Sequence, residues 1–277
     1  MTALVLYHDT YACTGSAGAT APDLVLLHGW GMHSVVWDPI VPALLEHYQV
    51  TVIDLPGMGR SPLPGGHYDL DYVIQHLLAV APARAVWMGW SLGGEIATAI
   101  AARYPERVSA LLLVASNPSF ARRDDWSCAM PSEQLQQFRD FYEEDPEGTL
   151  IRFLSLQCRG SRRMKEDIRF LQEILYLQGL PAPQALRAGL RLLAEVDVRE
   201  LILEALPMFS REEMGDHALK LDAADRTFKG ATREFKRCVW GGGTARKEKC
   251  TAQINWWYFR TPARSNAQLE DELATVR

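Results

Sequence analysis

The chain contains 277 residues, of which 48% are hydrophobic and 23% are charged, and its formal net charge is −5. This composition predicts one large domain, or a core that carries an inserted cap, and it gives no general case for nucleic-acid binding. The first nine residues lack the features of a signal peptide, and no apolar run approaches the ~18 residues of a membrane span, so we expect a cytoplasmic protein.

The first part of the chain alternates between strand and helix patterns. Four short apolar runs predict buried strands: 24–27, 50–55, 85–88 and 110–115. Three stretches with helical spacing or small residues predict the helices between them: 36–47, 72–80 and 94–104. Strands that alternate with helices of this length are typical of an α/β fold, in which helices cover both faces of a parallel sheet.

From about residue 120 to residue 195 the strand pattern is replaced by four helical stretches. Their apolar positions repeat at three- and four-residue spacing, as in Leu135, Phe138 and Tyr142. We interpret the segment as a four-helix lid over the carboxyl edge of the sheet; ordinary helix packing in the core is the alternative. The predicted organisation is a core of residues 1–119, a lid of residues 120–195 and a C-terminal part of the core from 196 to 277.

Residues 89–93 have the sequence Gly-Trp-Ser-Leu-Gly and lie directly between a predicted strand and a predicted helix. In that context the pattern is typical of a nucleophile elbow, a sharp turn that exposes the hydroxyl of its serine. Glycine tolerates the backbone angles and the close approach that such a turn requires. The alternative is a chance occurrence in a loop. We therefore predict that Ser91 is a nucleophile that attacks an acyl carbon.

Together with two further motifs, at residues 26–31 and 54–61, the elbow resembles the α/β-hydrolase superfamily. Within it, the particular residues at 30, 90, 105–108 and 152–157 resemble the pimeloyl-[acyl-carrier-protein] methyl ester esterases of biotin synthesis. This likeness extends from residue 24 to about residue 207. Three motifs at the right spacing are far more specific than one.

The resemblance implies a role for each matched residue. Ser91 would be the nucleophile, and the backbone N–H groups of Leu92 and Trp30 would form the oxyanion hole. The residues implied to bind the substrate are Trp30, Ser91, Leu92, Phe153, Leu154, Ser155, Leu156 and Gln157. His28 would be a structural residue of its turn, because the general base of this fold lies late in the chain.

The predicted lid carries a group of cations that we call the basic face. It comprises Arg152, Arg159, Arg162, Arg163, Lys165 and Arg169. Only Glu166 and Asp167 oppose them between residues 152 and 169. Because acyl carrier proteins are strongly acidic, such a face would guide their encounter with the enzyme. A solvated helical face without a partner is the alternative.

The general base is the point at which the likeness fails. This fold needs a Ser, then an Asp or Glu, then a His in chain order, but His217 is the only histidine after Ser91. Asp216 lies near the expected acid position, with Asp222 and Asp225 as weaker candidates. Neighbouring side chains in a strand point to opposite faces, which argues against an Asp216–His217 pair. A solvated loop histidine is the alternative for His217.

The composition also changes toward the end of the chain. Residues 226–264 contain ten Lys or Arg and two Glu, and residues 254–259 form the only strand-like run there. A tail that binds nucleic acid or membrane is one interpretation, but its basic residues show little helical order. A shifted reading frame that replaces the last strands of the family is the other, and it would also account for the missing histidine.

The leading functional hypothesis is a serine carboxylesterase that acts on the methyl ester of a pimeloyl group held by an acyl carrier protein. An acyl-enzyme mechanism implies no metal or organic cofactor. The five cysteines are scattered without a Cys-x-x-Cys pair, which indicates neither a disulfide framework nor a zinc site. We expect a monomer with no membrane or nucleic-acid partner. The alternatives are a hydrolase of small esters or C–C bonds and a catalytically impaired relative without a base.

Overall fold

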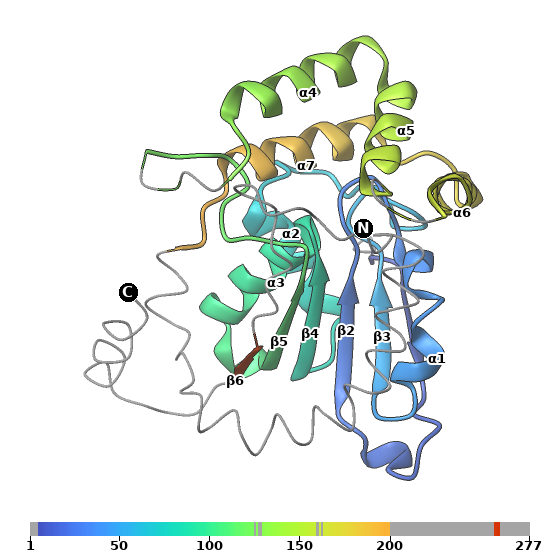
Figure 1. The fold of residues 1–277 in the computed structure, drawn as a ribbon. Coiled ribbons are helices and arrows are strands. Elements are labelled where there is room, and N and C mark those ends of the chain that lie inside the picture. The colour runs from blue at the N-terminus through green and yellow to red at the C-terminus, as the bar shows by residue number, and fades with distance from the viewer. Residues whose placement is uncertain are drawn as a thin grey trace, which may run out of the picture.

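The computed structural model describes residues 5–124, 126, 129–158, 161 and 163–199, together with the backbone of residues 258–260. Within these residues a six-stranded sheet has the order β1-β3-β2-β4-β5-β6 (Figure 1). The four inner strands, β2 (Asp23–Leu27), β3 (Gln49–Ile53), β4 (Ala85–Trp90) and β5 (Val108–Val114), are parallel. They are the four strands that the apolar runs predict.

Both edge strands run antiparallel to their neighbours. At one edge, β1 (His8–Tyr11) pairs with β3 and is mostly exposed, which explains why no apolar run marks it in the sequence. At the other edge, β6 (Tyr258–Arg260) pairs with β5 and lies partly within the strand-like run at residues 254–259.

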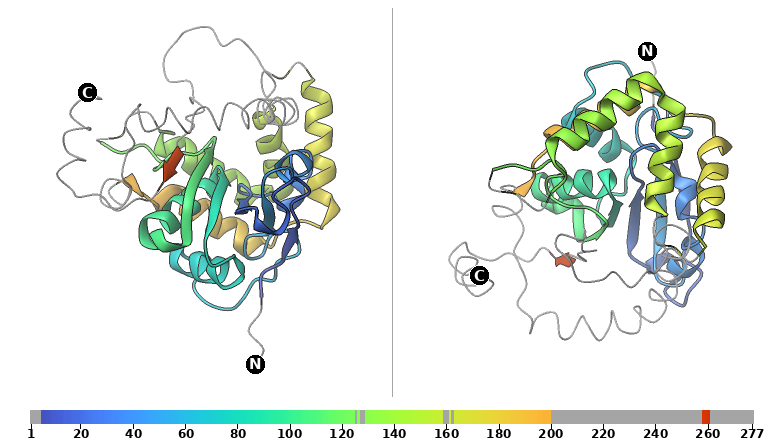
Figure 2. Two further views of the ribbon diagram at one scale, coloured as in Figure 1. Left: turned by 90° about the horizontal axis from the view of Figure 1, so that it is seen from below. Right: turned by 45° about the horizontal axis from the view of Figure 1, so that its top comes forward.

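Helices cover both faces of the sheet. On one face lie α2 (Leu70–Val80) and α3 (Leu92–Arg103), and on the other lies α1 (Val41–Leu44) (Figures 1 and 2). The long helix predicted over residues 36–47 is wrong. The structure has a short 3₁₀ turn, η2 (Ser34–Trp37), followed by the single turn of α1. Pro39 and Pro42 lack the N–H group that a continuous helix needs, so the segment breaks there.

Four helices follow β5, as predicted: α4 (Ser132–Glu144), α5 (Pro146–Gln157), α6 (Met164–Leu177) and α7 (Pro183–Glu195). They lie together over the carboxyl ends of the parallel strands, with α7 directly above the sheet (Figures 1 and 2). The predicted fold class, an α/β-hydrolase fold with a four-helix lid, is therefore confirmed. Among the described residues, no helix is both long and apolar enough to cross a membrane.

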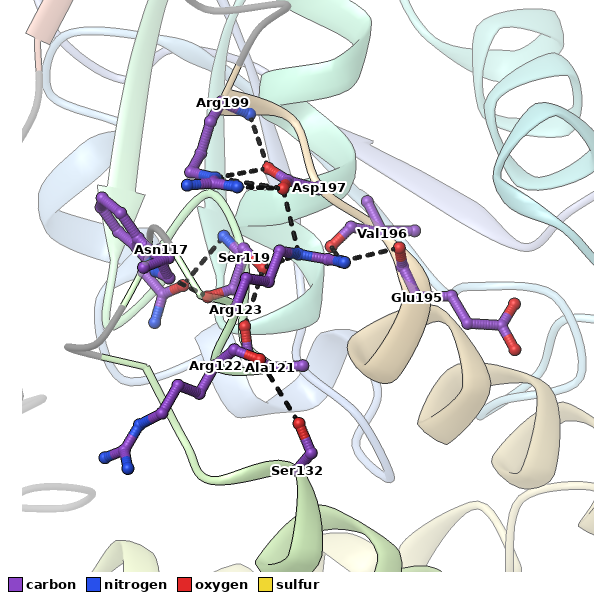
Figure 3. A network of polar contacts seen from close by, with 11 residues as sticks. Asn117, Ser119, Ala121, Arg122, Arg123, Ser132, Glu195, Val196, Asp197 and Arg199 are labelled. Atoms are coloured by element: carbon purple, nitrogen blue, oxygen red, sulfur yellow. Dashed lines mark hydrogen bonds and ion pairs between the residues drawn. The ribbon is translucent and has the colours of Figure 1, made fainter.

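The two ends of the lid are tied together at its base (Figure 3). Arg123, which precedes α4, donates hydrogen bonds to the carbonyl oxygens of Glu195 (3.0 Å) and Val196 (3.4 Å) at the end of α7. Its guanidinium also pairs with Asp197 at 3.0 Å, and Arg199 holds the same carboxylate at 2.7 Å. We call this group the lid clamp. It fixes where the helical segment leaves the sheet and where it returns.

Candidate active site

Ser91 occupies the sharp turn between β4 and α3. Its backbone angles, φ 53° and ψ −120°, lie in a region that non-glycine residues adopt only when their surroundings enforce it. The Ser91 N–H donates to the carbonyl oxygen of Val114 at 2.9 Å, which attaches the turn to the neighbouring strand. No side chain caps α3 at this point, and the Ser91 side chain is only partly buried. This geometry is that of a nucleophile elbow.

The glycines around Ser91 are required by close backbone contacts. A Cβ atom on Gly89 would lie 2.3 Å from the carbonyl oxygen of Gly93. A Cβ atom on Gly93 would lie 2.5 Å from the carbonyl oxygens of both Leu27 and His28, at the end of β2. Real Cβ atoms essentially never approach so closely. The two glycines of the motif therefore allow β4, α3 and the end of β2 to meet at one point.

The predicted oxyanion donors lie beside the elbow. A Cβ atom on Gly29 would lie 3.3 Å from the Cβ atom of Ser91, so the turn that carries Trp30 passes close to the Ser91 side chain. Across the part of the chain that the structure describes, the N–H groups of Trp30 and Leu92 have no hydrogen-bond acceptor. Both residues are 1% exposed. Two buried, unpaired donors next to a serine are what an oxyanion hole requires.

The lid covers these donors and holds the Trp30 ring. The Trp30 indole N–H donates to the carbonyl oxygen of Leu186 in α7 at 2.8 Å. Its ring also makes edge contacts with Phe138 and Phe153, at centroid distances of 5.5 Å and 5.3 Å. Gly189 in α7 allows the close approach, because a Cβ atom there would lie 2.7 Å from the Trp30 ring and 3.4 Å from Leu92.

The five predicted substrate residues of the lid belong to one helix, α5, and therefore point in different directions. Phe153 is partly buried against Trp30, and Leu154 is fully buried. Leu156 is 58% exposed, and Ser155 donates its hydroxyl to the carbonyl oxygen of Ile151 at 2.9 Å. Gln157 is partly buried. Of the five, Phe153 has the most direct link to the elbow, through Trp30.

His28 is fully buried, and its ring ties two loops together. Nδ1 lies 2.8 Å from the carbonyl oxygen of Gly29, and Nε2 accepts a hydrogen bond from the Leu55 N–H at 2.9 Å. Burial lowers the pKa of His28 to about 4, although Asp54 opposes the shift. The ring is therefore neutral, with its proton on Nδ1. Because both nitrogens are occupied, His28 has the structural role that the sequence predicts for it and is not available as a general base.

Several of the predicted site residues, Arg162 of the basic face among them, lie outside the described residues. Asp216 and His217, the predicted acid and base, lie outside the described residues, as does Arg159 of the basic face. Asp222 and Asp225 also lie outside them. The roles of Asp216 and His217 stay predictions. Among the residues that the structure does describe, no group of three His, Cys, Asp or Glu side chains could hold a metal ion.

Glu95, an acid in the first turn of α3, belongs to no functional motif in the sequence, yet it lies buried beside the elbow. Glu95 is 1% exposed, and in the described part of the chain neither of its carboxylate oxygens has a hydrogen-bond partner. Burial, together with the charge of Asp197, raises its pKa well above the usual range, and Arg123 of the lid clamp opposes this shift. Only its place in a strongly apolar and small-residue helix could have marked it as buried.

The described residues of the basic face lie on α5, on α6 and at the N-terminus of α6. Arg152, Lys165 and Arg169 are exposed, and no described carboxylate forms an ion pair with them. Arg163 is also exposed, but it forms an ion pair with Glu166 one turn along α6. Three of the predicted carrier-protein contacts are therefore open to an acidic partner, and a fourth is already neutralised in part.

Comparison with known proteins identifies the family. A profile of the alpha/beta hydrolase fold matches residues 22–194, which is more than half of the chain. The chain belongs to the α/β-hydrolase fold family.

Curated relatives of the chain include esterases of pimeloyl-[acyl-carrier protein] methyl ester from several bacteria. The pimeloyl-[acyl-carrier protein] methyl ester esterase of Aeromonas hydrophila is 47% identical over 182 residues, which are 65% of this chain and 70% of that protein. The protein of the same name from Klebsiella pneumoniae is 44% identical over 185 residues, or 67% and 71% of the two chains. The resemblance predicted from the motifs is therefore confirmed.

Solved structures agree at the level of the fold. An esterase from Exiguobacterium antarcticum has a TM-score of 0.62 at 18% identity, covering 72% of this chain and 73% of that one. The enol-lactonase from Burkholderia xenovorans has a TM-score of 0.59 at 20% identity, with 72% and 74% covered.

Proposed function

We propose that the protein is a serine carboxylesterase that hydrolyses the methyl ester of a pimeloyl group carried by an acyl carrier protein. One observation carries the proposal: a strained Ser91 lies beside two backbone donors that have no acceptor among the described residues, in a chain related at 42–47% identity to esterases of that name. We also expect the protein to be a cytoplasmic monomer without a nucleic-acid partner, with its core and lid divided at residues 119 and 195.

The chemistry divides one difficult step into two. The Ser91 hydroxyl oxygen attacks the ester carbonyl carbon while its proton passes to the general base, for which His217 is the candidate. The oxyanion that forms is stabilised by the N–H groups of Trp30 and Leu92. Collapse of this intermediate releases methanol, which takes the proton from the base. Water then hydrolyses the acyl-enzyme, frees the carboxylic acid and restores the Ser91 hydroxyl.

The lid and the elbow together offer one environment for the methylene chain of the substrate and another for the carrier protein. The aromatic cluster of Trp30, Phe138 and Phe153 gives an apolar environment next to the elbow, which suits the methylene chain of a dicarboxylic ester. The exposed cations on α5 and α6 suit the acidic surface of the carrier protein. A hydrolase of small free esters would need the first feature but not the second.

A fluorophosphonate probe, which reacts with activated serines, tests the proposal. We expect rapid labelling of the full-length chain, and no labelling of Ser91→Ala. Methanol release from a methyl pimeloyl group on an acyl carrier protein should fall by about 10⁴-fold or more in the same variant, as in other serine hydrolases. Failure of the folded wild-type chain to react would mean that Ser91 has no functional base, and the esterase proposal would be wrong.

A further inference from the structure

Ser116 lies in the loop after β5, directly beneath the elbow. The residue before it, Ala115, has φ 47°, a left-handed conformation that costs energy for any residue with a Cβ atom. Besides Ser91, Ala115 is the only non-glycine residue with positive φ in the described part of the chain. The two strained residues lie close together in space, because Ser116, which follows Ala115, forms a hydrogen bond to Ser91.

That contact is a hydrogen bond to the main chain of the nucleophile. The Ser116 hydroxyl donates to the carbonyl oxygen of Ser91 at 2.9 Å, and Ser116 is 8% exposed. The turn at Ala115 brings the hydroxyl to this position. Gly94 leaves room for it, because a Cβ atom on Gly94 would lie 2.5 Å from the Ser116 Cβ and 2.7 Å from its hydroxyl oxygen.

The carbonyl of Ser91 and the N–H of Leu92 belong to the same planar peptide group. A hydrogen bond to the carbonyl oxygen therefore fixes the direction of the N–H on the opposite side of the plane. It also polarises the peptide, since hydrogen bonds in a chain strengthen one another. The N–H groups of Gly94 and Glu95 reach the same oxygen at 2.9 Å and 3.2 Å, but they belong to α3 itself. Ser116 is the contact that comes from a different element.

We propose that Ser116 is a positioning residue of the oxyanion hole: its hydroxyl orients and polarises the peptide between Ser91 and Leu92, so that the Leu92 N–H faces the developing oxyanion. This inference rests on the proposed esterase function and adds a residue to its machinery. The strain at Ala115 is explained by the same role, because it is the cost of placing the hydroxyl under the elbow. The Ser116 hydroxyl bonds to the carbonyl oxygen of Ser91 and not to its reacting hydroxyl, so it acts through the peptide group.

Ser116→Ala tests the inference, and Thr98→Val is the matched control. The Thr98 hydroxyl is also buried and donates to a main-chain oxygen of the same helix, that of Gly94, at 2.8 Å, but it does not contact the peptide between residues 91 and 92. Valine has the shape of threonine without the hydroxyl. We expect the fluorophosphonate labelling rate and kcat to fall about tenfold in Ser116→Ala, with KM nearly unchanged, because part of one oxyanion donor is lost. Thr98→Val should stay within about twofold of the wild type.

A spectroscopic measurement separates this inference from the proposed function. The chain contains only two Ser-Leu pairs, 91–92 and 155–156, so labelling serine carbonyls with ¹³C and leucine amides with ¹⁵N gives two correlated signals. Ser116→Ala should shift the 91–92 signal in both dimensions and leave the 155–156 signal in place. An unchanged 91–92 signal, or an unchanged labelling rate, overturns the inference. A wild-type chain that does not react with the probe overturns the proposed function, and the spectrum alone then decides whether Ser116 orients the peptide.

Discussion

The elbow at residues 89–94 and the described residues of the basic face depend on different forces. Close contacts between buried atoms determine the elbow, whereas exposed charges determine the basic face. At the elbow, positions are fixed by contacts between backbone atoms, and residues that flank Ser91, such as Trp90 and Leu92, are 1% exposed. On the basic face, Arg152, Lys165 and Arg169 are exposed and without described ion pairs. Steric repulsion rises steeply over a fraction of an ångström, whereas the attraction between charges decays slowly and is screened by salt. One added methyl group at the elbow should therefore lower the stability of the fold strongly. One reversed charge on the basic face should lower kcat/KM only moderately.

The largest effect is expected for Gly93→Ala. The new methyl group would lie 2.5 Å from carbonyl oxygens of Leu27 and His28, and neither oxygen can move without shifting the end of β2. Overpacking of this kind costs about 3 kcal/mol of unfolding free energy, and labelling of Ser91 should be lost with it. Urea unfolding measures the first quantity. Gly65→Ala is the control, because a Cβ atom there meets nothing within 4 Å; if both variants unfold at the same urea concentration, the steric account of the elbow is wrong.

A second prediction concerns Glu95, the ionisable group that the elbow helix buries. Because burial raises its pKa in the folded protein, the native state binds a proton that the unfolded chain releases above its ordinary pKa. Stability from this group is therefore fully present below the ordinary glutamate pKa and is lost as the pH rises toward the raised value. Glu95→Leu should be more stable than the wild type at pH 8 by about 1–3 kcal/mol, the usual cost of an unsatisfied buried polar group.

Urea unfolding between pH 5 and pH 9 measures this difference. Glu95→Gln is the matched control, since it keeps the shape and polarity of the side chain but cannot titrate. Asp197 and Arg123 also face this region, so Asp197→Asn is measured beside it. If the wild type and Glu95→Gln lose stability equally as the pH rises, the titration does not belong to Glu95.

The elbow is also the part of the site that can best be predicted from the sequence. Its function depends on residues adjacent in the chain, so a strand, a Gly-x-Ser-x-Gly pattern and a helix are enough to predict it. The lid helices can be predicted for a similar reason, because each of them has apolar residues at helical spacing within its own segment. The edge strand β1 cannot be predicted in this way, because it is mostly exposed and an exposed strand needs no apolar pattern.

Contacts between distant segments are what the sequence does not show. Ser116 follows Ser91 by 25 residues, and nothing in its local sequence indicates that its hydroxyl reaches the nucleophile's carbonyl. The sequence gives no indication of the ion pair between Arg123 and Asp197 in the lid clamp either. The apolar spacing over residues 36–47 predicts a continuous helix there, whereas Pro39 and Pro42, which the spacing does not take into account, interrupt it.

The smallest effect is expected for Arg169→Glu on the basic face. Arg169 is exposed on α6, and reversing its charge should lower kcat/KM for the carrier-linked ester by about three- to tenfold at low salt, mainly through slower association. The difference should shrink at 0.5 M NaCl, where screening shortens the reach of the field to a few ångströms. Arg122→Glu makes the same change of charge at an exposed site before the lid helices and should have less effect. Hydrolysis of a free methyl ester should be unchanged in both variants. Equal losses on the free and the carrier-linked ester would place the effect in the active site instead, and would remove the carrier protein from the account of the basic face.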